Sequence, residues 1–258
     1  MAKLTKAQAK AHNQACDLLE KDSLTFNERV FVLENWREDA THINTVAGAF
    51  FTPPGLARDL VIETSGHKIV DLCAGIGGLS FWTYHHLDHQ TPPEITCIEI
   101  NPDYVEVGKK ILPEATWICA DVLASGVETF GKFDCAIANP PFGAVQGSGK
   151  GKKYSGSNFE FKVIELASKI ASWGAFIIPQ MSAPFQYSGA QCYSNQSPDK
   201  YVKFKEQTGI ELGGNCGFDT SIYLNDWHGV SPAVEIVTAD FDLWTEADER
   251  KQFELFAA

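Results

Sequence analysis

Short, almost continuous apolar runs alternate with segments of helical periodicity through the middle of the chain. The apolar runs predict strands at 67–73, 94–100, 116–121, 133–139 and 174–180. The intervening segments predict helices at 77–87, 102–112 and 158–171. Apolar runs without alternation are typical of strands buried on both faces, and helical connections are typical of parallel pairing. The pattern therefore predicts an α/β fold with a parallel sheet covered by helices on both faces.

The pattern differs at the two ends of the chain. Helices are predicted at 4–21 and 26–38, with Ser23 or Asn27 as the N-cap of the second, and Pro54 can start a third. After Gln180 a polar stretch intervenes. Alternating character then returns at 211–218, 221–227 and 233–244, which predicts closing strands with an antiparallel edge.

Composition bounds the compartment and the type of partner. The chain has 258 residues, 44% of them apolar, which is enough for the core of one large domain. No apolar stretch is long enough to cross a bilayer, and the N-terminal sequence has no signal-peptide core, so we expect a cytoplasmic protein without membrane contact. The net charge of −12 argues against broad adhesion to nucleic acid but allows a local basic groove.

Cysteine and histidine spacings give no sign of a metal centre. The seven cysteines include no CxxC pair, which favours reduced, structural thiols over disulfides or zinc ligands. His85 and His89 are four residues apart, but the sequence offers no evident third ligand. We therefore expect no metal, and a structural role for these histidines near a helix end.

The tetrad Asn139-Pro140-Pro141-Phe142 directly follows the apolar run FDCAIA. Each proline fixes φ and lacks an N–H, so the turn offers carbonyl acceptors on a rigid backbone. Asn139 adds a side-chain acceptor, and Phe142 adds a flat face on which a planar group can stack. Acceptors beside a stacked ring suit an exocyclic amine. An isolated Pro-Pro pair would indicate an ordinary loop, so this interpretation depends on the sequence upstream.

Polar residues also follow three earlier predicted strands. Asp71 ends the first strand and precedes the glycine-rich turn 75–78, whose backbone amides can approach a ligand closely. Glu99 ends the second, where an acid can accept both hydroxyls of a ribose. Asp121 ends the third, where a carboxylate can accept from an adenine amine. Because parallel strands end at one sheet edge, these groups and Asn139 are predicted to line one site.

In this order, the motifs resemble those of S-adenosylmethionine-dependent N6-adenine DNA methyltransferases. The matching segments are FFTPP (50–54), DLCAGIGG (71–78), CIEIN (97–101), CADVL (119–123), ANPPFG (138–143) and GAFIIPQ (174–180). The position of FFTPP ahead of the glycine-rich turn resembles the gamma arrangement of that family. The resemblance implies a Rossmann-like methyltransferase fold with a seven-stranded, mostly parallel sheet. It also implies S-adenosylmethionine as cofactor, S-adenosylhomocysteine as product, and methyl transfer to the N6 amine of adenine in DNA.

The same resemblance implies roles for individual residues. The catalytic tetrad, Asn139, Pro140, Pro141 and Phe142, would hold the target base, with Phe142 stacked on it. Trp227 would be a second stacking residue, and a packing role in the core is its alternative. The residues implied to bind the cofactor are Phe51, Thr52, Pro53, Asp71, Cys73, Ala74, Gly75, Gly77, Glu99, Ile100, Asp121, Val122 and Asn139.

Target recognition is where the chain departs from the family pattern. DLCAGIGG differs from the DPxCGSG of close relatives, and too little sequence follows residue 245 for the recognition domain usual in the gamma class. We expect an N-terminal helical extension (1–47), a catalytic domain (48–245) and a tail (246–258). Recognition would then come from the N-terminal helices, from the segments 143–157 and 181–220, or from a separate specificity subunit.

The loop after the tetrad carries candidate nucleic-acid contacts. Lys150, Lys152 and Lys153 lie among its glycines, so they could contact phosphates or simply decorate a solvated, flexible loop. DNA is the expected partner and structured RNA the runner-up. Glutamine methylation of a protein is disfavoured because Phe142 stands where those enzymes carry Tyr. Cytosine-C5 methylation would need a Pro-Cys dipeptide, which the chain lacks, and a non-catalytic subunit is disfavoured by the intact tetrad.

Overall fold

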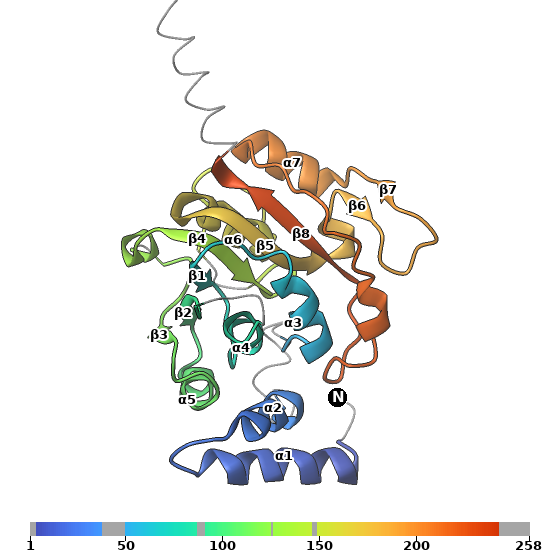
Figure 1. Ribbon diagram of the computed structural model, residues 1–258. Helices are drawn as coiled ribbons and strands as arrows, with labels where there is room; N and C mark the ends of the chain where they lie inside the picture. Colours follow the sequence, from blue (N-terminus) through green and yellow to red (C-terminus); the bar gives the residue numbers. More distant parts are fainter. Residues whose placement is uncertain (1–3, 38–49, 87–90, 125, 146–148, 243–258) are drawn as a thin grey trace, which may run out of the picture.

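The computed structural model describes residues 4–37, 50–86, 91–124, 126–145 and 149–242. Within these ranges, six strands form one sheet in the order β3-β2-β1-β4-β5-β8 (Figure 1). Their bounds are β1 Lys68–Asp71, β2 Glu94–Glu99, β3 Thr116–Cys119, β4 Phe133–Ala138, β5 Ala171–Pro179 and β8 Val234–Asp240. The first five pair in parallel and β8 pairs antiparallel with β5, which confirms the predicted mostly parallel sheet with an antiparallel edge.

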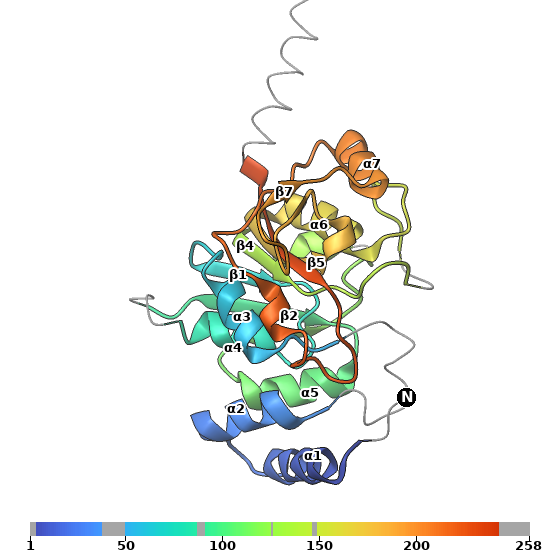
Figure 2. The same ribbon diagram turned by 90° about the vertical axis from the view of Figure 1, so that its right-hand side faces the viewer.

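Helices cover both faces of this sheet (Figures 1 and 2). On one face lie α3 (Pro54–Val61), α4 (Gly78–Tyr84) and α5 (Pro102–Ile111), and on the other lie α6 (Phe159–Ile170) and α7 (Asp199–Thr208). Neighbouring residues of one strand belong to different cores: Phe176 packs with α6 and α7, whereas Ile177 packs with α3. This two-sided burial explains why the strands read as continuous apolar runs.

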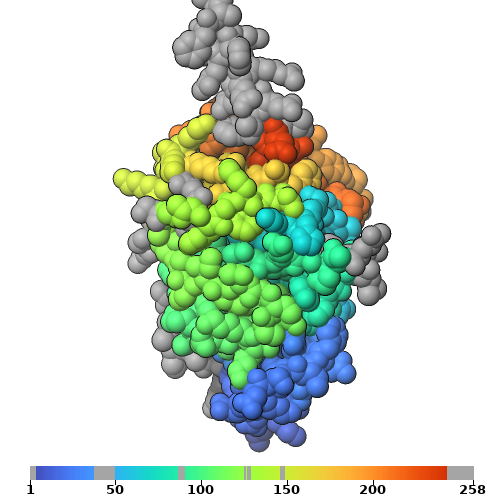
Figure 3. Space-filling model, turned by 60° about the vertical axis from the view of Figure 1, so that its left-hand side comes forward, coloured from blue at the N-terminus to red at the C-terminus, as the bar shows by residue number. Residues whose placement is uncertain are grey.

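Two N-terminal helices, α1 (Lys6–Leu19) and α2 (Phe26–Asn35), form a further layer beyond α4 and α5, at one end of the molecule (Figures 1 and 3). Val32 and Leu33 of α2 are buried in a cluster with Phe81 of α4 and Tyr104 of α5. The predicted extension is therefore part of the packed structure. The predicted boundaries near residues 47 and 245 lie outside the described residues.

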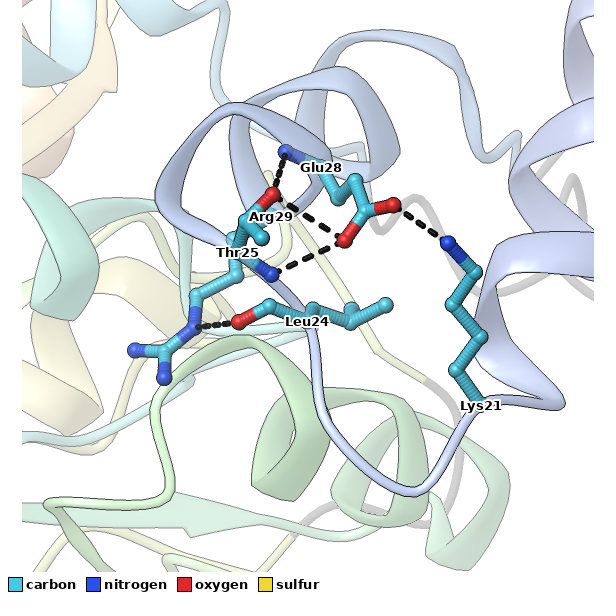
Figure 4. Close-up of polar contacts among 5 residues, drawn as sticks. All are labelled: Lys21, Leu24, Thr25, Glu28 and Arg29. Atoms are coloured by element: carbon cyan, nitrogen blue, oxygen red, sulfur yellow. Dashed lines mark hydrogen bonds and ion pairs between the residues drawn. The ribbon is translucent and has the colours of Figure 1, made fainter.

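Thr25, rather than Ser23 or Asn27, is the N-cap of α2 (Figure 4). Its hydroxyl accepts from the backbone N–H of Glu28, and Glu28 Oε2 accepts from the Thr25 N–H at 2.9 Å. This reciprocal pair satisfies two backbone donors that the first helical turn leaves open. Arg29 then donates to Glu114 beyond the end of α5, which ties the N-terminal layer to the rest of the fold.

The C-terminal third corrects two predictions. The sheet has six strands in the described residues, not seven, and neither 211–218 nor 221–227 is a strand. The first contributes only an isolated bridge from Gly213 to Thr238, and the second contains a 3-10 turn, Thr220–Tyr223. Helix α7 was not predicted, although Tyr201, Phe204 and Thr208 are buried along one side of it. The remaining elements are a two-stranded ribbon, β6 (Phe185–Gln186) with β7 (Ser194–Asn195), and the 3-10 turns Val127–Phe130 and Gln180–Ser182.

No helix in the described ranges is long and apolar enough to cross a membrane.

Candidate active site

The strand order reverses between β1 and β4, and the largest apolar cavity of the candidate site lies there, outside the carboxyl ends of the strands. Open α/β sheets bind ligands at this switch point. The cavity has a volume of about 290 Å³, near the lower end of the range for small-molecule sites, roughly 300–1,000 Å³. Its lining residues are Phe50, Phe51, Leu72, Cys73, Gly75, Ile98, Glu99, Ile100, Tyr104, Ala120, Asp121, Val122, Asn139, Pro141, Val145 and Phe159.

Glu99, the last residue of β2, is held in the wall of this cavity by two backbone donors. Its Oε2 accepts from Gly75 N at 2.9 Å and its Oε1 accepts from Asn101 N at 2.8 Å. Burial raises the pKa of Glu99, although these hydrogen bonds oppose the shift. Each carboxylate oxygen keeps a further lone pair, so Glu99 can accept two more hydrogen bonds from a ligand.

The wall beside Glu99 combines apolar surface with one more carboxylate. Ile100 is 64% exposed, an unusual state for a large apolar residue, and Val122 presents a second apolar side chain from the end of β3. Asp121 lies between the two strand ends, and its Oδ1 accepts from Leu123 N at 2.9 Å. A flat apolar group with a polar amine at its edge suits this part of the cavity.

The glycine-rich turn between β1 and α4 adopts backbone angles that favour glycine. Gly75 has a φ of +55° and Gly77 has a φ of +88°. A Cβ at Gly75 would also lie 3.2 Å from the Phe51 ring. The turn therefore brings the FFTPP segment and the main chain after β1 close together, as its glycines suggested.

Asp71 is buried behind the cavity and is not part of its lining. It is fully buried, and its Oδ2 accepts from Ser80 Oγ of α4 at 2.8 Å. Its Oδ1 accepts no hydrogen bond from the described residues. Burial raises the pKa of Asp71 to about 7, with a smaller contribution from the nearby Glu99 charge, while the Ser80 hydroxyl acts in the opposite direction. The structure therefore supports a role in fixing β1 to α4.

Asn139 follows β4 and has a fixed amide orientation. Its Nδ2 donates to Phe50 O at 3.1 Å and to Thr52 Oγ1 at 2.9 Å. Both partners are acceptors in this arrangement, so the amide nitrogen must face them and the oxygen must face the other way. That oxygen, Oδ1, is buried and accepts no hydrogen bond from the described residues. A buried acceptor without a donor is unfavourable, so Oδ1 is available to accept a hydrogen bond from a ligand.

A second, smaller cavity of about 30 Å³ adjoins the first at Asn139. Phe50, Phe51 and Gly75 line both cavities, whereas Thr52 and Ala74 line only the smaller one. The structure thus brings together most of the residues predicted from the FFTPP, glycine-rich and tetrad motifs. Pro53, Gly77 and Pro140 are buried next to these positions and are absent from the lining.

The two predicted stacking residues share an apolar cluster. Phe142 is half-buried against a cluster that includes Leu56, Leu60 and Trp227. Trp227 is only 5% exposed. Such a side chain offers little free ring face to a base, so the structure supports the packing alternative for Trp227.

A buried carboxylate of α6 holds the turn that follows the tetrad. Glu160 is fully buried; its Oε2 accepts from Gly143 N at 3.0 Å and its Oε1 accepts from Ser182 Oγ at 2.8 Å. A second residue of α6, Glu165, accepts from the backbone N–H groups of Lys153 and Tyr154. The described part of the loop 143–157 is therefore anchored, in contrast to the predicted flexible loop.

Sequence reasoning missed several residues of this site. Tyr104 and Phe159 line the cavity from helices whose burial patterns gave no sign of a ligand. Glu160 and Glu165 lie in a helix that reads as amphipathic, and their charge suggested solvent exposure. The one available signal for Glu160 was a carboxylate in the first turn of the helix that follows the tetrad.

Comparison with known proteins supports a methyltransferase fold. A model of the family described as "Methyltransferase small domain" matches residues 56–152. A comparison with curated protein sequences finds no match. Among solved structures, the modification subunit assigned to a type I restriction enzyme of Vibrio vulnificus is 14% identical with a TM-score of 0.57, and the match covers 86% of this chain and 51% of that one.

Two further structures give the same picture. The methyltransferase subunit of a type I restriction-modification system from Streptococcus thermophilus is 12% identical with a TM-score of 0.55, over 83% of this chain and 48% of that one. A protein assigned as a class I S-adenosylmethionine-dependent methyltransferase from Listeria monocytogenes is 14% identical with a TM-score of 0.54, over 86% and 69%. The chain spans about half the length of the two restriction-modification subunits. It has the class I methyltransferase fold.

The family match and the fold both indicate S-adenosylmethionine as the cofactor, and the cavity fits that molecule. The free lone pairs of Glu99 suit the two ribose hydroxyls, and Ile100 and Val122 offer apolar surface for the adenine ring. Asp121 lines the same cavity and offers a carboxylate acceptor there. The cavity also extends to Asn139, the first residue of the tetrad.

Proposed function

We propose that this protein transfers a methyl group from S-adenosylmethionine to the N6 amine of adenine in DNA. The observation that carries the proposal is the fixed amide of Asn139, whose buried Oδ1 lacks a donor beside the larger cavity. An adenine amine has two hydrogens and therefore suits a pair of acceptors at this point. When bound, S-adenosylmethionine supplies the electrophilic methyl group.

The tetrad residues would act on the amine directly. The lone pair of N6 is delocalised into the adenine ring, so the free amine is a poor nucleophile. Asn139 Oδ1 and the Pro140 carbonyl would accept its two hydrogens and favour a pyramidal nitrogen with an available lone pair. Because this geometry belongs to the transition state, the two acceptors would stabilise it more than the ground state. Pro140 and Pro141 would keep the acceptors rigid.

The base must leave the double helix to reach a buried acceptor of this kind. Phe142 is the residue that we propose for stacking on the flipped base, through the part of its ring that the apolar cluster leaves exposed. The restriction-modification subunits with a similar fold support DNA as the substrate class. Both neighbours are subunits of restriction-modification enzymes, so we also propose a separate specificity subunit as a partner.

Single-turnover methylation with mass-spectrometric identification of the product tests this proposal. DNA, structured RNA and a protein extract are offered in parallel, and N6-methyladenine in DNA is the expected product. Asn139→Ala should lower the rate by at least about 100-fold, as removal of a transition-state hydrogen bond does elsewhere, and should leave cofactor affinity nearly unchanged. Asn195→Ala, at an exposed position on β7, is the matched control. Product at RNA, cytosine or glutamine, or a fully active Asn139→Ala enzyme, would contradict it.

A further inference from the structure

Lysine side chains gather beside the cofactor cavity, on the side of α6 and the loop after the tetrad. A cavity of about 220 Å³ is lined by Lys150, Lys152, Lys162 and Lys169. A neighbouring cavity of about 500 Å³ is lined by Lys150, Lys152, Lys153 and Lys162. We call these five residues and the two cavities that they line the lysine pocket.

The lysine pocket adjoins the candidate active site. Val122 lines both the 290 Å³ cavity and the 220 Å³ cavity, and Val145 lines both the 290 Å³ cavity and the 500 Å³ cavity. One residue therefore separates the two regions at each of these points. A chain-like ligand with a group at Asn139 can extend directly into the lysine pocket.

The main chain of the pocket is built around a buried acid. Glu165 is 2% exposed and accepts from Lys153 N at 2.6 Å and Tyr154 N at 3.1 Å. A Cβ at Gly151 would lie 2.4 Å from Glu165 Oε2, so the loop can approach the acid this closely only with glycine there. Lys162 is 7% exposed and donates to Gly149 O at 2.9 Å. These hydrogen bonds fix the loop that carries Lys150, Lys152 and Lys153 against α6.

The lysine pocket carries an excess of positive charge. Four lysines and a single glutamate occur among the described residues that line the 220 Å³ cavity, in a chain whose formal net charge is −12. Lys169 Nζ lies 3.6 Å from Glu165 Oε1, and this ion pair offsets one of the four charges. Several ammonium groups in one concave wall repel one another and attract a multiply charged anion. Lysine binds phosphate as a point charge without demanding a fixed geometry, which suits a flexible sugar-phosphate chain.

We propose that the lysine pocket binds phosphodiester groups of the nucleic-acid strand that carries the target base. This inference rests on the proposed function and adds a binding site to it, with Lys162 and Lys169 of α6 acting alongside the three loop lysines. The site reads backbone charge and no base sequence. It holds the strand in place while the flipped base occupies the site at Asn139.

Fluorescence anisotropy with a labelled, adenine-free oligothymidylate measures this binding without any methyl transfer. The affinity is recorded over a range of salt concentrations for the wild type and for two variants with the same loss of charge. Lys150→Gln/Lys152→Gln removes two pocket lysines. Lys6→Gln/Lys10→Gln, on α1 at the other end of the molecule, is the control. The salt slope is the slope of the logarithm of the binding constant against the logarithm of the salt concentration, and each phosphate contact to a single strand contributes about 0.7 to its magnitude. The slope of the pocket variant should therefore be smaller by roughly 1.4 than that of the wild type, and the slope of the control should be unchanged.

An equal slope in the pocket variant and the wild type would overturn the proposal, as would an equal loss in the two variants. Inorganic phosphate is added in a competition arm. Displacement of the oligonucleotide by inorganic phosphate, at a concentration equal to that of the oligonucleotide's own phosphate groups, would show that the lysine pocket binds free anions. That result would overturn the proposal that the pocket binds a nucleic-acid strand. The two proposals can be distinguished. If the strand binds through these lysines but mass spectrometry finds no N6-methyladenine, the proposed methyl transfer is wrong and the lysine pocket still binds the strand.

Discussion

Thr52 Oγ1 accepts a hydrogen bond from Asn139 Nδ2 at 2.9 Å, which joins two segments that lie 87 residues apart in the sequence. With the Phe50 carbonyl, it determines which end of the Asn139 amide faces the candidate site. Thr52 is therefore a positioning residue in our interpretation: it acts on the reaction only through the orientation of Asn139.

Thr52→Val should lower kcat by about 10-fold, because loss of one hydrogen bond of about 1.4 kcal/mol leaves only the Phe50 carbonyl to hold the amide orientation. KM for DNA should change little. Thr52→Ser keeps the hydroxyl, so its kcat should be close to that of the wild type. If Thr52 acted only by stabilising the fold, kcat would instead change in step with the thermal stability of each variant. Steady-state kinetics together with thermal unfolding separates the two, and a Val variant as active as the Ser variant would contradict the positioning role.

Glu99→Gln should weaken the binding of S-adenosylmethionine by about 1–3 kcal/mol, because the ligand would lose hydrogen bonds to a charged acceptor. The pKa of Glu99 is raised by burial, so wild-type affinity should fall as the pH falls through that raised pKa, where the carboxylate becomes protonated. The variant should lose this dependence. Calorimetric titration at several pH values is the measurement, with Glu106→Gln, at an exposed position on α5, as control. Equal affinities for wild type and Glu99→Gln would rule out the ribose contact.

Glu160→Gln should disturb the turn after the tetrad. Glu160 accepts hydrogen bonds through both carboxylate oxygens, from Gly143 N on one side and from Asn158 Nδ2 and Ser182 Oγ on the other. Glutamine would therefore place its NH₂ group against a donor in either orientation. We expect a loss of about 1–3 kcal/mol in the free energy of unfolding and a lower kcat. Chemical denaturation and single-turnover rates measure the two effects. Glu206→Gln, at an exposed position on α7, should change neither.

Asp71 should make the protein less stable as the pH rises. Its pKa is about 7 in the folded protein, above the ordinary value of about 4 in an unfolded chain. The folded state therefore binds more protons between these values, and the free energy of unfolding falls with rising pH by up to about 1.4 kcal/mol per unit between about pH 4 and pH 7. Asp71→Asn should remove this contribution. Chemical denaturation of the wild type and of Asp71→Asn is measured over this pH range, and the difference between their stabilities isolates the contribution of Asp71 from that of other titrating groups. Stabilities that change with pH in parallel would show that Asp71 is not protonated on folding.

Local patterns predicted the parallel sheet correctly. Glu99, Asp121 and Asn139 could be placed together because each follows a buried strand, and parallel strands end at one edge. The helix α7 could have been predicted from the turn of Gly209 at its C-terminus and the spacing of Tyr201, Phe204 and Thr208. The alternating character of 211–218 and 221–227 misled because the first segment pairs with the sheet only at the Gly213–Thr238 bridge and the second begins within a 3-10 turn.

The hydrogen bonds that fix the site could not be predicted from periodicity. Thr52 and Asn139 belong to different motifs, and only the folded chain brings their side chains into contact. Glu160 and Glu165 occur in a helix whose sequence gives no sign that its charged residues face inward. Similarly, Asp71 occupies the expected strand end, but whether its carboxylate faces a ligand or Ser80 depends on the packing of α4.

Two interior acids, Glu160 and Glu165, hold the loop after the tetrad through its main-chain N–H groups. Every residue except proline carries such an N–H, so an acid that grips the backbone makes few demands on the side chains above it. The side chains of this loop can therefore differ between related chains while its anchoring points stay the same. What the loop contacts and how the turn after the tetrad is held are thus separate demands on the sequence.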